Sequence, residues 1–171
     1  MDAAILFAQH HPSLFRYLSR LTGDPDVAED AAQEAFVRLM ERPPAPGETR
    51  AWLFRVGTNA AWMALRTRGR RRRLLEAAPL RAPLGDAPPA PDAHAETAEV
   101  RERVRAALDG LPERDRTILM MQQEGFRYRE IAEAVGTTTQ SVGTMIARAL
   151  NKLAAELRLD DEEEDGWNPY R

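Results

Sequence analysis

A proline-rich stretch near the middle of the chain constrains the fold most strongly. Residues 79–97 hold five prolines and almost no large apolar side chains. That composition does not pack a hydrophobic core and is typical of an extended linker. We therefore expect a linker over residues 76–98 that separates two folded blocks, residues 1–75 and 99–159, with an acidic tail at residues 160–171.

Both blocks have the periodicity of helices rather than of strands. The expected helices span residues 3–21, 26–41, 49–73, 98–108, 113–124 and 128–135, and a last helix starts at Thr138 or Thr139. Asp26 is a candidate N-cap of the second helix. The apolar faces are expected to include Ile5, Met40 and Leu150. The sequence thus predicts an all-α protein made of two small helical domains.

Composition excludes several kinds of site. The chain has no cysteine, which rules out disulfides, thiolate metal ligands and a cysteine nucleophile. His10, His11 and His94 are too scattered for a convincing metal site. We expect no metal, no cofactor and no small-molecule substrate. No apolar run is long enough to span a bilayer and the N-terminus lacks a secretory pattern, so we expect a cytoplasmic protein.

The net charge of −3 averages two opposite regions. Residues 160–165 are six consecutive acids, and without residues 160–171 the net charge of the chain becomes +2. Residues 42–75 contain nine arginines and one acid. One segment therefore favours binding to a polyanion, although the chain as a whole is acidic.

The positive charge is densest in residues 66–73, where six of eight positions are arginine. Trp52 and Trp62 precede this arginine tract in the same expected helix. Exposed rings beside arginines suit the stacking of unpaired bases along a phosphate backbone. The alternative is that both tryptophans are buried and the arginines only complement the helix C-terminus. We favour nucleic acid on charge density, because a helix dipole needs far fewer than six arginines.

The second block ends in two amphipathic runs separated by a glycine turn. Residues 128–153 read YREIAEAVGTTTQSVGTMIARALNKL, with Gly136 at the position where a chain leaving a helix often needs positive φ. Helix, short turn and helix is the pattern of a DNA-binding helix-turn-helix. An ordinary helical hairpin inside a bundle has the same periodicity, so this stretch alone leaves both interpretations open.

Three motifs, in order and across the linker, resemble those of one family. They are EDAAQEAF at residues 29–36, WLFRVGTN at residues 52–59, and LPERDR at residues 111–116 ahead of YREIAE at residues 128–133. With them the chain resembles an extracytoplasmic-function (group four) sigma factor of the sigma-70 family, over nearly all of residues 3–159. The resemblance implies two helical domains, sigma regions two and four.

The resemblance also implies partners and roles. Core RNA polymerase would bind the acidic and polar side chains of Asp26, Glu29, Asp30, Gln33 and Glu34. The minus-ten element would be opened and held by Trp52, Phe54, Arg55, Asn59, Trp62, Arg66 and Arg70. The minus-thirty-five element would be read as duplex by Tyr128, Thr139, Gln140, Ser141, Thr144, Arg148 and Lys152. An anti-sigma factor, often membrane-anchored in this family, is a further expected partner.

The chain departs from the family pattern in three places. Gly143, Thr144 and Met145 stand where family members often have lysine or arginine, and Gly143 weakens its helix by about 1 kcal/mol relative to alanine. A close approach of the backbone to DNA would account for that glycine. Met63 stands where aspartate is common. The acidic tail, with Trp167 and Tyr170, is outside the usual pattern; it is either solvated or a competitor of DNA for the arginine tract.

Two other functions fit part of the sequence. A free-standing helix-turn-helix regulator would bind duplex DNA without polymerase, but no dimerisation heptad is visible. A nuclease would need Mg²⁺ held by Glu29, Asp30 and Glu34, which lie on one helix without a matching cluster elsewhere. The sequence therefore predicts a sigma factor that performs no covalent chemistry itself.

Overall fold

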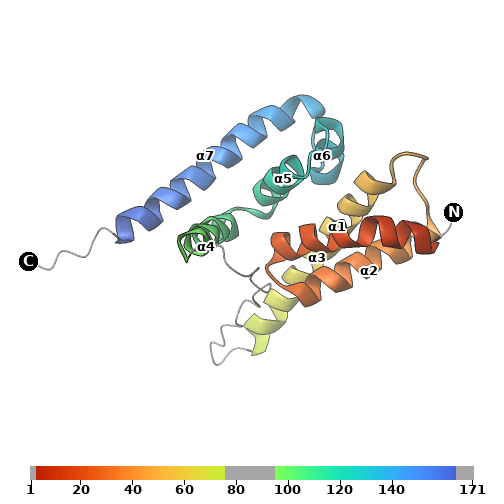
Figure 1. The fold of residues 1–171 in the computed structure, drawn as a ribbon, viewed down its shortest axis with the longest axis horizontal. Coiled ribbons are helices and arrows are strands. Elements are labelled where there is room, and N and C mark those ends of the chain that lie inside the picture. Colours follow the sequence, from red (N-terminus) through yellow and green to blue (C-terminus); the bar gives the residue numbers. More distant parts are fainter. Residues whose placement is uncertain (1–2, 76–94, 165–171) are drawn as a thin grey trace, which may run out of the picture. The chain divides into compact units, whose positions relative to one another are not determined.

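The computed structural model describes the backbone of residues 3–75 and 95–164 and the side chains of residues 3–71 and 100–157. The chain divides into two compact units, residues 1–87 and 88–171. In the described parts all regular structure is helical, which confirms the all-α prediction (Figure 1). The proline-rich centre of the expected linker and the end of the tail lie outside the described residues.

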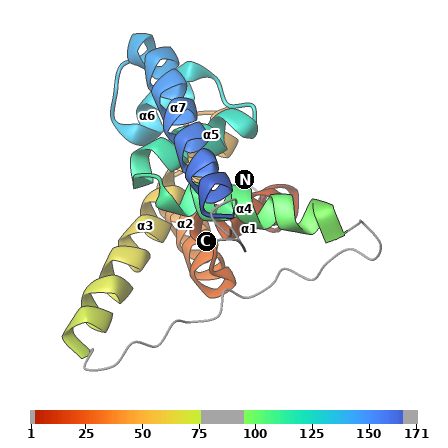
Figure 2. The same ribbon diagram turned by 90° about the vertical axis from the view of Figure 1, so that its left-hand side faces the viewer.

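The first unit contains three helices, α1 (Ala3–Thr22), α2 (Pro25–Glu41) and α3 (Thr49–Leu75). They pack around a core in which the hydroxyl groups of Tyr17 and Thr58 form a buried hydrogen bond of 2.9 Å. The last turns of α3 extend beyond α1 and α2 (Figures 1 and 2). Helix α3 therefore packs against α1 and α2 along its first half, and its last turns project beyond them.

Gly57 sets the distance between α1 and α3. A Cβ atom added at Gly57 would lie 3.2 Å from Leu18 Cδ1 and 3.3 Å from Leu14 Cδ1. Both leucines are fully buried, so they have little room to move. A glycine at this position lets the two helices approach more closely than any other residue would.

The second unit contains α4 (Ala95–Gly110), α5 (Glu113–Gln123), α6 (Tyr128–Val135) and α7 (Thr139–Glu164). The long helix α7 packs against the other three (Figure 1). Arg116 of α5 is buried: its Nε donates to the carbonyl oxygen of Leu108 at 2.8 Å, and its Nη2 lies 2.5 Å from Asp109 Oδ1. Burial lowers the pKa of Arg116, and Asp109 opposes that shift. This arginine joins the end of α4 to the start of α5.

Several predictions about individual residues are wrong. The N-cap of α2 is Asp24, not Asp26, because Pro25 takes the first helical position and needs no backbone donor there. Ile5, Met40 and Leu150, expected in the core, are 62%, 52% and 51% exposed. Helix α7 continues to Glu164, past the residue at which the acidic tail is expected to begin, and the boundaries of the domains and the tail stay predictions.

Candidate nucleic-acid interface

The candidate minus-ten residues share one face of α3. Trp52, Arg55, Asn59, Trp62, Arg66 and Arg70 follow one another at intervals of three or four residues in an uninterrupted helix. This spacing brings side chains to the same side of a helix. Asn59, Arg66 and Arg70 are exposed, while Trp52, Arg55 and Trp62 are half-buried. The six residues form the outer face of α3, a strip that combines ring surface, an amide and three guanidinium groups.

Phe54 does not belong to the outer face of α3. Its ring is fully buried against Tyr17, with the ring centroids 4.9 Å apart, and the Arg50 guanidinium lies 5.1 Å above it. The prediction that Phe54 contacts promoter DNA is contradicted by this burial. Position 54 lies two residues from Trp52, which corresponds to about 200° around a helix and therefore to the opposite side.

Met63 extends the outer face of α3. It lies four residues after Asn59 and is 59% exposed. An unbranched apolar side chain between Asn59 and Arg66 offers contact surface to a base ring, where a carboxylate would repel phosphate. The departure from the family pattern at this position is thus compatible with a nucleic-acid face.

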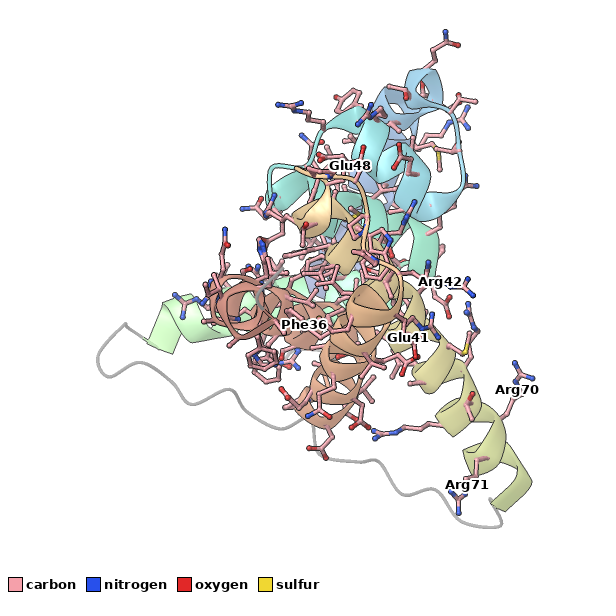
Figure 3. The ribbon with its side chains drawn as sticks, turned by 90° about the vertical axis from the view of Figure 1, so that its right-hand side faces the viewer. Phe36, Glu41, Arg42, Glu48, Arg70 and Arg71 are labelled. Atoms are coloured by element: carbon pink, nitrogen blue, oxygen red, sulfur yellow. The ribbon has the colours of Figure 1, made fainter. Side chains whose placement is uncertain are left out.

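The arginine tract does not point in one direction. Figure 3 shows Arg70 and Arg71 leaving the α3 ribbon on different sides. Arg68 instead extends toward the start of α2, where its Nη1 lies 2.6 Å from Oδ2 of Asp24. Among the described arginines of the tract, Arg68 is thus held by a carboxylate at the start of α2, while Arg70 and Arg71 point in different directions.

A second candidate surface lies on the outer side of α2. Asp26, Asp30 and Gln33 are exposed, whereas Glu29 and Glu34 are half-buried. The two glutamates already have partners on the protein. Gln33 Nε2 donates to Glu29 Oε1 at 2.9 Å, and Arg38 Nε donates to Glu34 Oε1 at 2.7 Å. Glu29 Oε2 also lies 3.3 Å from Nε2 of His11, a residue of α1.

Sequence reasoning missed two apolar members of the α2 surface. Val37 and Met40 are 56% and 52% exposed and follow Gln33 at intervals of four and three residues. The signal that would have found them is this spacing, which continues the line of Asp26, Asp30 and Gln33. The surface therefore has a charged half and an apolar half, the usual composition of a protein-binding patch.

The structure forms the predicted turn between α6 and α7. Gly136 has φ of 67° in the left-handed region, and the Thr137 amide donates to the Ala132 carbonyl at 2.9 Å. The hydroxyls of Thr138 and Ser141 lie 2.8 Å apart at the start of α7. These contacts hold the first turn of α7 at a defined angle to α6, as a helix-turn-helix requires.

The candidate minus-thirty-five residues fall into three groups. Tyr128, Thr139, Gln140, Thr144 and Arg148 are exposed, and the last three recur every four residues on one side of α7. Ser141 is half-buried. Lys152 continues the four-residue spacing, but its Nζ donates to Asp115 Oδ2 on α5 at 2.5 Å. Lys152 therefore has a partner within its own unit.

Gly143 faces α6 rather than solvent. A Cβ atom added at Gly143 would lie 3.6 Å from Cε2 of Tyr128, an ordinary contact distance. Gly143 is nevertheless half-exposed, so a close approach of its backbone to DNA stays a prediction. The ring of Tyr128 lies beside Gly143 of α7 while the residue stays 45% exposed.

The environment of His10 is the other notable electrostatic feature of the first unit. Burial lowers the pKa of His10, and the nearby charge of Arg50 at the start of α3 lowers it further. The described residues contain no group of three His, Cys, Asp or Glu side chains that could hold a metal ion. None of the described helices is long and apolar enough to cross a membrane.

Comparison with known proteins matches each unit to a protein family. Sigma-70 region 2 matches residues 6–71, and Sigma-70 region 4 matches residues 101–153. The chain is 33% identical to the ECF RNA polymerase sigma factor SigE of Mycolicibacterium smegmatis, over 86% of this chain and 58% of SigE. It is 32% identical to the ECF RNA polymerase sigma factor EcfG of Rhodopseudomonas palustris, over 91% of this chain and 84% of EcfG. This chain thus spans a little over half of the first relative and most of the second.

Two solved structures have the same fold. One is the sigma factor RpoE of Bartonella quintana in complex with the anti-sigma factor NepR, with a TM-score of 0.67 and 23% identity over 87% of this chain and 92% of that one. The other is the PhyRSL–NepR complex of Sphingomonas sp. Fr1, with a TM-score of 0.60 and 22% identity over 92% and 90% of the two chains. At these identities the likeness concerns the fold alone.

Proposed function

Because the chain belongs to the extracytoplasmic-function sigma factors of the sigma-70 family, we propose that it binds core RNA polymerase and directs promoter-specific transcription initiation. Its place of action is then that of the polymerase, in the cytoplasm. The protein supplies binding energy and no covalent chemistry. The observation that carries the proposal is the outer face of α3, where one uninterrupted helix aligns rings, an amide and arginines.

In the minus-ten element, the outer face of α3 holds a melted strand. Trp52 and Trp62 are half-buried and offer ring surface on which an unpaired base stacks. Asn59 is exposed between them, and its amide has the donor and the acceptor needed to recognise a base edge. Arg66 and Arg70 neutralise phosphates one and two turns further along the helix. The binding of captured bases offsets the few kcal/mol that unstacking costs.

In the minus-thirty-five element, the front of α7 enters the major groove of intact duplex. Gln140, Thr144 and Arg148 lie on one side of the helix and are exposed. Amide and guanidinium groups form the bidentate contacts that distinguish adenine and guanine in this groove. Lys152 is held by Asp115, so we expect fewer phosphate contacts here than on α3.

Core polymerase binds the surface of α2. The charged half of this surface, residues 26–34, sets the register and orientation of the complex with polymerase, because complementary charge provides specificity. Val37 and Met40 supply the apolar area that a stable interface requires. An anti-sigma factor is a further expected partner, since the similar RpoE was solved in complex with one.

The direct test is transcription with purified core polymerase and genomic DNA, followed by mapping of transcript starts. We expect starts that depend on this protein and that share two elements, one near minus ten and one near minus thirty-five. Asn59→Ala should abolish most of these starts while leaving polymerase association in a pull-down intact. DNA binding by the chain alone, with no association with polymerase, would instead identify a free-standing regulator.

A further inference from the structure

Arg68 occupies a special position within the arginine tract. It follows Phe54 and Ala61 at intervals of seven residues, and both of these are fully buried. Residues seven apart lie on nearly the same side of a helix. Arg68 is therefore on the core side of α3, opposite Arg66 and Arg70, and beyond Ala61, the last fully buried residue among the described side chains of α3.

The partner of Arg68 is a carboxylate that the chain holds rigidly. Asp24 Oδ1 accepts from the amides of Asp26 at 2.9 Å and Val27 at 3.1 Å, which makes it the N-cap of α2. The backbone amide of Asp24 donates to the hydroxyl of Thr22 at 3.2 Å. That hydroxyl is buried and donates to the Leu18 carbonyl at 2.8 Å. Asp24 is thus fixed to the end of α1 and to the start of α2.

The second carboxylate oxygen of Asp24 is used by α3. Oδ2 lies 2.6 Å from Arg68 Nη1, a pair formed by residues 44 positions apart. Asp24 therefore contacts all three helices of the first unit: its backbone amide bonds to Thr22 of α1, and its side chain caps α2 and pairs with Arg68 of α3. Ion pairs between half-exposed groups are weak when both side chains must be ordered. Here the carboxylate is already immobilised by the cap, so only the arginine has to be ordered.

We propose that Asp24 and Arg68 are positioning residues for nucleic-acid binding. Arg68 does not contact phosphate; through Asp24 it fixes the direction in which the projecting end of α3 carries Arg66 and Arg70. The inference rests on the proposed role of the outer face of α3 in holding promoter DNA. Arg68 thus has a different role from Arg66 and Arg70, although all three are arginines of the same tract.

The geometric part of the proposal is tested with spin labels. The chain has no cysteine, so Arg16→Cys on α1 and Arg71→Cys on α3 create two unique attachment sites. Distances between the labels are measured by pulsed electron paramagnetic resonance on the full chain. We expect a narrow distribution for the labelled parent, and a broader one for both Asp24→Asn and Arg68→Gln. The double variant should be no broader than either single variant, because both remove the same contact.

Asp24→Asn keeps the fold in this test. Asparagine caps helices as well as aspartate does, so the bonds to Asp26 and Val27 remain. The thermal midpoint, followed by circular dichroism, shows that α2 is still formed. An unchanged distance distribution in both single variants would overturn the proposal. A distribution broadened only by Asp24→Asn would also overturn it, since the effect would then act through the cap.

The functional part is tested with a fluorescein-labelled single-stranded DNA 20-mer and fluorescence anisotropy over a range of salt concentrations. Arg68→Gln should weaken binding on the order of 2- to 5-fold, the range of a surface ion pair, with an unchanged dependence of log K on log salt. Arg70→Gln should weaken binding and also reduce that slope by roughly 0.7, because a phosphate contact is lost. Arg68→Lys, which keeps a cation near Asp24, should restore most of the affinity.

The outcomes distinguish this inference from the proposed function. A slope reduced by Arg68→Gln as much as by Arg70→Gln would show that Arg68 contacts phosphate, and would overturn the inference alone. Absence of binding by the parent and by every variant at low salt would remove the nucleic-acid role of α3. The positioning role for DNA would then fall with it, even if the label distances confirmed the contact.

Discussion

The long helices of the two units, α3 and α7, have similar lengths, 27 and 26 residues, but expose different kinds of side chain. The last turns of α3 extend beyond α1 and α2, and the sequence places the arginine tract there. Helix α7 packs against three helices and exposes small polar groups near its start. Arginine side chains suit the phosphate backbone of a melted strand, because phosphate contacts do not depend on base identity. Polar side chains at fixed positions on a helix suit base edges in a duplex.

Both helices also hold a basic side chain with a carboxylate of their own unit. Arg68 pairs with Asp24, whose side chain is 36% exposed, and Lys152 pairs with Asp115, whose side chain is 14% exposed. In α3 the pair lies beyond Ala61, the last fully buried residue among the described side chains of this helix. In α7 the pair lies between two helices that already pack together. In both helices a basic side chain has a carboxylate partner within its own unit, so its charge alone does not identify a phosphate contact.

The largest expected effect tests whether the two units are independent. Arg116→Ala should destabilise the second unit by about 3 kcal/mol, because it leaves the Leu108 carbonyl and Asp109 without their buried partner. Thermal unfolding followed by circular dichroism should show an early transition. Tryptophan fluorescence, recorded in a Trp167→Phe background so that only Trp52 and Trp62 emit, should keep the parent midpoint of the first unit. A single shifted transition seen by both methods would show that the units unfold together.

The next effect concerns charge. The double change Arg66→Gln and Arg70→Gln should weaken binding to single-stranded DNA by roughly 10-fold or more at low salt and reduce the salt slope by about 1.4. The matched change in α7, Gln140→Ala with Thr144→Ala, should leave that slope unaltered. It should reduce the preference for the minus-thirty-five duplex, measured by competition with a scrambled duplex. Equal loss of slope in the two doubles would remove the distinction between the helices.

A smaller effect compares how tightly the two helices pack. Gly57→Ala should destabilise the first unit by about 1 kcal/mol, because the cost of overpacking exceeds the gain in helix propensity. Gly143→Ala should stabilise the second unit by up to about 1 kcal/mol, since its Cβ meets Tyr128 at an ordinary distance. Urea unfolding of each variant measures both. Opposite signs support the packing argument, and a stabilised Gly57→Ala protein would contradict it.

The smallest effect is pH dependence in the first unit. The folded state lowers the pKa of His10, so the unfolded chain binds more protons near the ordinary value of about 6.5, and stability falls as pH decreases through this range. His10→Gln should flatten that dependence. The four helices of the second unit, α4 to α7, contain no histidine, so the unfolding of this unit should depend less on pH over the same range. Urea midpoints at several pH values, read separately for the two units, provide the measurement.

Much of the secondary structure follows from local sequence. The helices expected from periodicity are all present, and Tyr128–Val135 has the predicted bounds. Gly136 adopts the positive φ that its position after an apolar run indicates. Local sequence did not identify the N-cap of α2, because two residues that can cap a helix lie close together there. Asp24 and Asp26 are both good caps, and the proline between them decides in favour of the first.

Exposure was harder to predict than helicity. Met40 and Leu150 fit the apolar stripe of their helices but lie where neighbouring helices do not cover them. Phe54 lies between the buried Leu53 and the half-buried Arg55, and its ring packs against Tyr17 of another helix. These outcomes depend on where helices end and cross, which the periodicity of a single helix does not encode.

The sequence by itself determined the helical class, the helix-turn-helix, the charge distribution and the family, because each depends on spacing and composition within short segments. The tertiary structure alone decided which side chains of α3 face outward, which arginine is held by Asp24, and which glycine admits a neighbouring helix. Those facts depend on contacts between residues tens of positions apart, such as Arg68 and Asp24. Long-range contacts form only when helices pack, so no local pattern specifies them.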